Sequence, residues 1–586
     1  MINLFRNARL GKLKVFALLV FLTFQVLGTM YLPRLTADII NYGVVLGDRD
    51  FVIRTGALMI AVAILTGLSS IMSTWYSAEV ATTFAKNTRR RLFSHTQKLS
   101  YQDFRRFSTS SLITRATNDI EQLQSTLSMF FDMMLPAPFV VIIGLALSFN
   151  RDPYMALIIL VSAVVFIVVS GLVALYVFPM FAKIQKGLDR INAYVSQYIS
   201  GVRVIRAFNR TKLEKARMDD AFLGLAKTNI KINRIFAAVM PLVFLSLSLA
   251  IVAIVWFGAI RIEAGSLQIG DIMAIMEYTM NILFYLLMAV FVVIYIPRAK
   301  VCAGRIREVL EHTPEITDGN AVIRDNGKLS LEFKNVTFKY NDAENPVLHN
   351  LSFKCEQGTT TAIIGGTGSG KSTVARLIPR LLDVSGGQIE LNGVNIKDVP
   401  QAELRKRIGF VPQRAFLFSG TIADNLRHGD KKATMRDIKR AAIVAQADSF
   451  ISERDNKYDA EVVQGGRNYS GGQKQRLAIA RMLTKKPSIY VFDDSFSALD
   501  FKTDAALREA LKEVTAESIV ITIAQRISTI MTADQIVVLD EGKIVGIGTH
   551  QELMSNCEVY QEIAKSQLSE EELQINQEKS TNERRK

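Results

Sequence analysis

Six long apolar segments in the first half of the chain constrain its fold more than any other feature of the sequence. A helix that crosses a membrane needs about 20 consecutive apolar residues, and soluble domains rarely carry six segments of that length so close together. The segments therefore predict an all-α domain of six transmembrane helices. They cover residues 15–37, 55–77, 127–149, 153–177, 235–260 and 269–297.

The loops between these segments predict how the helices are oriented. Lys and Arg gather in two long connections, 78–126 and 178–234, and are few in the three short ones. Because cytoplasmic loops carry the excess of Lys and Arg, both termini and the two long loops should face the cytoplasm. The same distribution accounts for the net charge of +15 without a nucleic-acid partner.

The two long basic loops are predicted to be helical. Each mixes apolar residues at helical spacing with charges, as in Phe84, Leu92 and Leu99, so the membrane helices should continue into the cytosol. The chain should turn back near residues 101–104 and 202–208. The first apolar run is too long for a cleaved signal peptide and is expected to be retained.

The sequence changes character after the sixth segment, which predicts a second domain. We expect a transmembrane domain over residues 1–312, a polar linker over 313–328, an α/β domain over 329–565 and a charged tail over 566–586. Residues 331–338 alternate like a half-buried strand, and 361–364 form a short apolar strand. Strand and helix patterns then alternate, as in an α/β fold.

A phosphate-binding loop follows the short apolar strand. The sequence from Gly365 to Ser372 fits the pattern G-x-x-x-x-G-K-[ST]. Glycines let successive backbone N–H groups face phosphates in front of a helix N-terminus, and a lysine adds charge. Asp493 ends a later apolar strand and should complete a Mg²⁺ shell with Ser372. The residues expected to bind ATP here are Gly365, Gly366, Thr367, Gly368, Ser369, Gly370, Lys371, Ser372 and Thr373.

A second motif identifies the family that the chain resembles. The segment Ser470-Gly471-Gly472-Gln473 resembles the signature of ATP-binding-cassette (ABC) ATPases, and with the six spans the whole chain resembles a half-transporter of the type I ABC exporters. The resemblance implies an α/β P-loop nucleotide-binding domain that uses ATP and Mg²⁺. The resemblance assigns the signature residues and Asp500 to nucleotide binding, and it places Tyr340 against the adenine ring. It assigns Gln413 to both the nucleotide and the metal.

Two positions depart from the family pattern. The usual catalytic glutamate is replaced by Asp494, and the usual switch histidine by Gln525. An aspartate is one methylene shorter, about 1.5 Å of reach, and a misplacement of that size costs about 100-fold in rate. Since two such subunits share two nucleotides, the resemblance implies a bacterial heterodimer in the cytoplasmic membrane. Its other subunit would be non-identical, with Glu and His intact, and its substrates would be drugs or other amphipathic compounds.

Three alternatives stay open from the sequence. Asp494 and Gln525 could be working variants of the catalytic pair. The chain could form a homodimeric exporter of lipid or peptide, or an ATP-gated channel or regulator. Glu277, a carboxylate inside the sixth segment, is expected to face a polar pathway rather than lipid, because a charge in the bilayer is costly.

Overall fold

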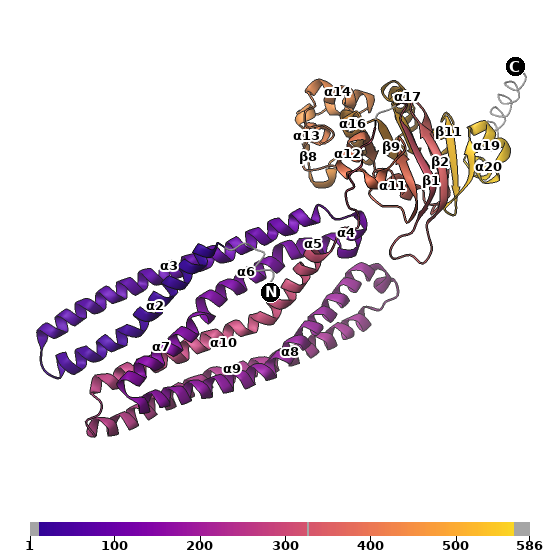
Figure 1. Ribbon diagram of the computed structural model, residues 1–586. Helices are drawn as coiled ribbons and strands as arrows, with labels where there is room; N and C mark the ends of the chain where they lie inside the picture. Colours follow the sequence, from indigo (N-terminus) through magenta and orange to yellow (C-terminus); the bar gives the residue numbers. More distant parts are fainter. Residues whose placement is uncertain (1–10, 325–326, 568–586) are drawn as a thin grey trace, which may run out of the picture. The chain divides into compact units, whose positions relative to one another are not determined.

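The computed structural model describes residues 11–324 and 327–567 (Figure 1). The chain divides into two compact units. The first contains the residues up to Lys98 together with Phe107–His312. The second contains Leu99–Arg106 together with the residues from Thr313 onward. The predicted charged tail lies almost wholly outside the described residues.

The first unit is all α-helical, as predicted. Within the described residues, six helices are long and apolar enough to cross a membrane, and each contains one predicted segment or most of it. The elements are α2 (Lys12–Asp38), η1 (Ile39–Val44), α3 (Arg49–Thr96), α4 (Tyr101–Phe107), α5 (Thr109–Thr114), η2 (Arg115–Asp119), α6 (Ile120–Met129), η3 (Phe130–Met134), α7 (Pro136–Arg151), α8 (Pro153–Ala207), α9 (Thr211–Glu263) and α10 (Ile269–Glu311).

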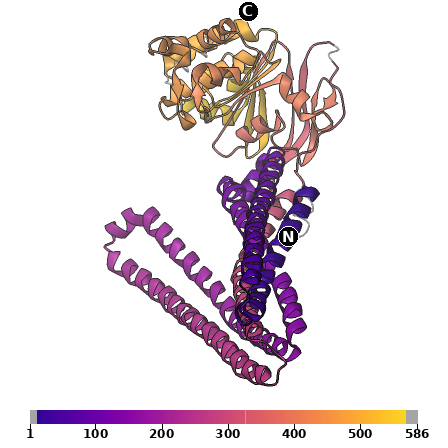
Figure 2. The same cartoon turned by 90° about the vertical axis from the view of Figure 1, so that its left-hand side faces the viewer.

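The helices α8 and α9 run far beyond the thickness of a membrane. They contain 55 and 53 residues, which is about 80 Å each at 1.5 Å per residue, against a hydrocarbon core of about 30 Å. The chain reverses between them at Phe208–Arg210, at the C-terminal end of the predicted region 202–208. Figure 2 shows this pair diverging from the other helices as it leaves the α9–α10 connection. The predicted helical character of the long loops is therefore confirmed.

Prolines explain an irregularity in the third span. The π-helical turn η3 comes immediately before Pro136 and Pro138, and the Leu135 N–H reaches back to the Phe130 carbonyl, 2.8 Å away. Proline has no N–H to donate and its ring crowds the preceding turn. The widened turn lets the helix continue past both prolines.

Charged side chains join the ends of the helices opposite the long loops. The Arg151 guanidinium contacts Asp38 of α2 at 2.8 Å and Asp271 of α10 at 2.9 Å. Arg261 at the end of α9 contacts Asp152, which caps α8, at 2.5 Å. Each arginine thus neutralises carboxylates that would be costly to bury alone. Arg151, the last residue of α7, joins α7 to α2 and α10, and Arg261 joins α9 to α8.

The second unit combines two sheets with helices. Five parallel strands and the antiparallel β12 form one sheet in the order β12-β11-β3-β10-β9-β6, and an antiparallel sheet has the order β2-β1-β4-β5. β1 alternates in burial, as predicted. The strands are β1 (Ser330–Phe338), β2 (Leu348–Glu356), β3 (Thr360–Gly365), β4 (Gly386–Leu391), β5 (Val394–Asn395), β6 (Ile408–Val411), β7 (Gly420–Thr421), β8 (Glu461–Val462), β9 (Ile489–Asp493), β10 (Ile519–Ile523), β11 (Gln535–Asp540) and β12 (Lys543–Gly548).

Two hydrophobic cores position the functional segments of this unit. In one, α11 packs with residues of both sheets, including Phe333 and Ile521. The other joins α13–α16 with α17 and includes Tyr469 and Leu477. The helices are α11 (Lys371–Leu377), η4 (Ile396–Asp398), α12 (Gln401–Arg407), α13 (Ile422–Arg427), α14 (Met435–Val444), α15 (Asp448–Ser452), η5 (Lys457–Asp459), η6 (Gln464–Gly466), α16 (Gly471–Lys485), α17 (Phe501–Thr515), α18 (Ile527–Ile530), α19 (His550–Asn556) and α20 (Glu558–Lys565).

Candidate functional site

The phosphate-binding loop joins the central strand β3 to the helix α11. The Lys371 ammonium lies over the loop and donates to the carbonyl oxygens of Gly365, at 2.8 Å, and Gly366, at 2.6 Å. Burial lowers the pKa of Lys371, although the nearby Asp494 and Asp493 carboxylates oppose the shift. Two backbone carbonyl groups therefore hold the ammonium at the loop, where it can contact the oxygens of a bound phosphate.

The glycines of the loop have different reasons to be glycine. A Cβ on Gly365 would clash with the Leu539 carbonyl of the neighbouring strand, and one on Gly370, at φ 93°, would meet the Leu348 side chain. Around Gly366 and Gly368 a Cβ would meet nothing within 4 Å. The loop is therefore packed tightly at its two ends and open between them. An open stretch of loop in front of a helix N-terminus fits a phosphate group.

An oxygen-rich pair lies beside this loop. The Ser372 hydroxyl donates to Asp493 Oδ1 at 2.9 Å, and burial raises the pKa of Asp493, which that hydrogen bond partly offsets. No group of three or more His, Cys, Asp or Glu side chains that could hold a metal occurs in residues 11–324 or 327–567. A hydroxyl with one carboxylate suits Mg²⁺, which takes few protein ligands and fills its shell with water and substrate phosphates.

Asp494 is held by the two glutamines that the sequence singled out. Its Oδ2 accepts from the side-chain amides of Gln413, at 3.0 Å, and Gln525, at 2.9 Å. The Asp494 backbone has φ 50° and its N–H donates to Ile523 O at 3.0 Å. Only 8% of the residue is exposed. These residues follow β6, β9 and β10, which are adjacent in the sheet, so the fold gathers them at one edge.

Tyr340 contacts the first turn of the helix that follows the loop. Its hydroxyl is 3.1 Å from Thr373 Oγ1 of α11. The Arg105 guanidinium lies over its ring, 5.7 Å from the centroid, and also contacts Asp342 at 3.3 Å. Sequence reasoning missed Arg105, because no pattern in the sequence links residues so far apart in the chain.

The signature segment begins α16. Ser470 caps this helix, accepting from the Gln473 N–H while the Gln473 side chain accepts from the Ser470 N–H. A Cβ on Gly472 would lie 3.1 Å from the Ala498 carbonyl. Asp500 caps α17 by accepting from the Thr503 N–H at 2.9 Å. The segment therefore presents two glycines at a capped helix N-terminus beside the 497–500 turn.

The signature and the phosphate-binding loop do not contact each other through polar groups. Within residues 11–324 and 327–567, no hydrogen bond or ion pair joins Ser470–Gln473 to Gly365–Thr373. Tyr469, just before the signature, and Val374, just after the loop, belong to different hydrophobic cores, one centred on helices and one on the sheets. The predicted site residues thus form two groups within one chain rather than a single pocket.

Comparison with known proteins shows which family has this arrangement. Residues 15–309 match the family model of the ABC transporter transmembrane region, and residues 348–497 match the family model described as ABC transporter. An uncharacterized ABC transporter ATP-binding protein of Mycobacterium tuberculosis is 38% identical over 551 residues, covering 92% of this chain and 94% of that protein. The chain belongs to the ABC transporter family. It is an ATP-hydrolysing exporter half with a multi-pass membrane domain, and it binds ATP and works as a dimer.

Two further comparisons cover almost the whole chain. An ATP-dependent lipid A-core flippase of Vibrio vulnificus is 30% identical over 569 residues, covering 96% of each protein. The structure of a bacterial Atm1-family ABC exporter with ATP bound superposes with a TM-score of 0.81 at 24% identity, covering 95% of this chain and 98% of that one. The fold predicted from the sequence, a six-helix membrane domain followed by an ABC-type ATPase domain, is confirmed.

Proposed function

We propose that this ABC transporter chain is the subunit that carries the hydrolysis-impaired ATP site of a heterodimeric exporter of amphipathic compounds. The observation that carries the proposal is the position of Asp494. Its carboxylate is a methylene shorter than the usual glutamate, and one of its oxygens already accepts two amide hydrogen bonds. Such a carboxylate is poorly placed to take a proton from an attacking water, because geometry decides the efficiency of a general base.

Nucleotide binding does not depend on Asp494 or Gln525. The open phosphate-binding loop, Lys371 and the Tyr340 ring supply the contacts for the triphosphate and the adenine. Ser372, Asp493 and the Gln413 amide oxygen would hold Mg²⁺, which neutralises phosphate charge when it is bound. The chain should therefore bind ATP with ordinary affinity and hydrolyse it slowly.

The intact signature suits the chain to a non-identical partner. Ser470–Gln473 keeps a capped helix N-terminus and two glycines, which can bind the phosphates of a nucleotide held by another subunit. We infer that the partner has the usual glutamate and histidine, so that most turnover occurs in its phosphate-binding loop against this chain's signature. The complex would lie in a bacterial cytoplasmic membrane with both termini of the chain in the cytosol.

Affinity purification of the chain from its native membrane tests this assignment. A related but non-identical ABC subunit should come with it. In that complex, Ser470→Ala should stop most ATP hydrolysis, because it damages the partner's site. Asp494→Asn should change the rate less than twofold. Equal losses from the two variants would show that hydrolysis does not divide between the sites in this way.

A homodimeric lipid exporter is the second candidate, supported by the similarity to a lipid A-core flippase along the whole chain. It requires Asp494 and Gln525 to work as a catalytic pair. The purified chain would then hydrolyse ATP at a normal rate in lipid vesicles without any other subunit. The heterodimer proposal expects almost no turnover from the same sample.

A further inference from the structure

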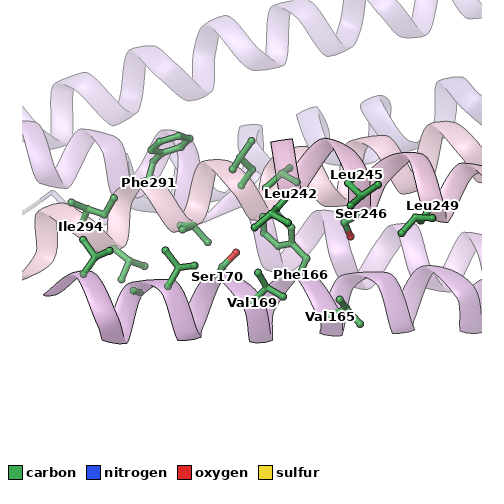
Figure 3. Close-up of a pocket in the computed structure, with 17 residues that line it drawn as sticks. Val165, Phe166, Val169, Ser170, Leu242, Leu245, Ser246, Leu249, Phe291 and Ile294 are labelled. Atoms are coloured by element: carbon green, nitrogen blue, oxygen red, sulfur yellow. The ribbon is translucent and has the colours of Figure 1, made fainter. Parts of the chain in front are cut away.

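A cavity of about 510 Å³ lies between α8, α9 and α10 of the membrane unit (Figure 3). This volume lies within the range of about 300–1,000 Å³ usual for small-molecule sites. Most of the lining is aliphatic or aromatic, with Phe166 from α8, Leu245 from α9 and Phe291 from α10. The cavity belongs to a single subunit and is remote in sequence from the nucleotide motifs.

The lining contains no ionisable side chain. An ion in such a cavity would lose its hydration without gaining an opposite charge or enough hydrogen bonds, which is highly unfavourable. Glu277, the carboxylate of the sixth segment, is not among the lining residues and is exposed in the isolated chain. The cavity therefore disfavours both cationic and anionic ligands.

Two hydroxyl groups are the polar groups of the lining. Ser170 of α8 and Ser246 of α9 both line the cavity, and Figure 3 shows their oxygens pointing into the space between the helices. Serines in membrane helices commonly donate to the carbonyl four residues earlier, as Ser162 does to Ile158 at 2.8 Å. Within the described part of the chain neither Ser170 nor Ser246 makes a hydrogen bond. Both remain able to donate to a ligand and to accept from it.

The two serines lie at the same depth. Ser170 is 17 residues after Pro153, where α8 begins, and Ser246 is 17 residues before Glu263, where α9 ends. Each is thus about 26 Å from the outer end of its helix, in a hydrocarbon core of about 30 Å. With the proposed orientation, the hydroxyls lie near the cytoplasmic boundary of the bilayer, at the depth of the polar end of an inner-leaflet lipid.

We propose that this cavity binds an uncharged amphiphile: a molecule with an apolar body and a neutral hydrogen-bonding group, such as a hydroxyl, ester or amide, that meets Ser170 and Ser246. The proposal rests on the export function proposed above and names the class of compound that this cavity takes; a cationic compound would have to bind outside it, for example beside Glu277. The absence of lining charge excludes ionised head groups, and the two hydroxyls select a neutral one. A purely aliphatic molecule would leave both hydroxyls unpaired.

The test compares three photoreactive probes with one acyl chain. The chain carries a diazirine and ends in glycerol, in a sulfate or in trimethylammonium. The full complex in lipid nanodiscs is illuminated with each probe, and the labelled peptides are identified by mass spectrometry. We expect the glycerol probe to label the peptides of α8 and α9 that line the cavity at least tenfold more than either charged probe.

Serine variants test the role of the hydroxyls. The double change Ser170→Ala and Ser246→Ala should reduce labelling by the glycerol probe about tenfold, the loss expected from two modest hydrogen bonds. Ser162→Ala is the matched control, because that hydroxyl is already bonded within its own helix and lies outside the lining, and it should leave labelling unchanged. Val169→Trp, which fills the cavity, should abolish labelling in complexes that still assemble and bind ATP.

Three outcomes would overturn the proposal. Equal labelling by all three probes would show that charge is not excluded. Equal loss in the Ser162→Ala control would show that the hydroxyls are not specific. Absence of labelling, together with photo-cross-linking to the second subunit from a benzophenone maleimide attached to Val169→Cys, would show that a partner helix fills the space. ATP-driven transport of the glycerol probe is measured separately, so that export with labelling elsewhere refutes the cavity alone.

Discussion

The hydrogen bonds around Asp494 allow its catalytic weakness to be tested by restoring both altered residues. In Asp494→Glu the added methylene extends the carboxylate by about 1.5 Å. The longer side chain recovers reach toward the attacking water but moves past the Gln413 and Gln525 amides that now hold it at 3.0 and 2.9 Å. In Gln525→His the amide is replaced by an imidazole, which can carry a positive charge near the γ-phosphate.

The expected gains follow from these distances. Because a misplacement of about 1 Å costs about 100-fold, the double variant should hydrolyse ATP about 100-fold faster than the wild type, a reduction of about 2.7 kcal/mol in activation free energy. Asp494→Glu alone should gain about tenfold in hydrolysis rate, since position 525 still holds a glutamine and no imidazole that could carry a positive charge. Gln525→His alone should change the rate less than twofold, because the short carboxylate still cannot reach.

Phosphate release from the full-length chain, reconstituted without any other subunit, isolates this site. Cross-linking should first establish that the sample is dimeric, and equilibrium ATP binding should be the same in all four proteins. Lys371→Ala in the double variant should remove the gained activity, since Lys371 belongs to the phosphate-binding loop. The reasoning is refuted if the double variant stays within twofold of the wild type, or if the gains of the two single changes simply multiply.

Three further predictions concern other parts of the molecule. Gly370→Ala should abolish measurable ATP binding and lower the melting temperature, because φ 93° and the nearby Leu348 side chain exclude a Cβ. Burial lowers the pKa of His550 below 6.5, so the folded state takes up its proton less readily than the unfolded state. Stability should be constant above about pH 6.5 and fall as the pH drops below it, and His550→Gln should flatten this dependence in thermal denaturation. Glu277→Gln should lower export of cationic compounds more than that of neutral ones with ATP binding unchanged, whereas equal effects in a vesicle transport assay would assign Glu277 to packing.

Local patterns predicted most of the fold. The six spans follow from apolar length, and the alternation of β1 and the apolar run of β3 follow from strand periodicity, because each is decided by residues close together in the chain. The full lengths of α8 and α9 were harder to predict, since their charged halves have the composition of loops and only the spacing of their apolar residues indicates a helix. The boundary between the units was also hidden, because Leu99–Arg106 packs with a domain that begins more than 200 residues later.

The candidate site was also predicted only in part. The phosphate-binding loop follows from its sequence motif, and Asp493 follows from the apolar strand before it. Asp494 and Gln525 were recognised because they differ from the residues usual in the ABC family. That Gln413 and Gln525 donate to one oxygen of Asp494 depends on the order of strands in the sheet, which no single segment encodes. The cavity beside Ser170 and Ser246 needs three helices to form, so sequence reasoning had no signal for it.

Arg105 places the short helix α4 beside the ring that we propose for adenine. Its guanidinium lies over the Tyr340 ring, and an adenine stacked on that face would have to displace it. With adenine on Tyr340, as we propose, the two groups would compete for one aromatic surface, and ATP binding would release Arg105 from that ring. By thermodynamic linkage, whatever pulls Arg105 off Tyr340 raises the affinity for ATP by the same factor by which ATP favours its departure. A force that reaches α4 through α3 or α5, the helices that flank it in the chain, would therefore change the affinity for the nucleotide.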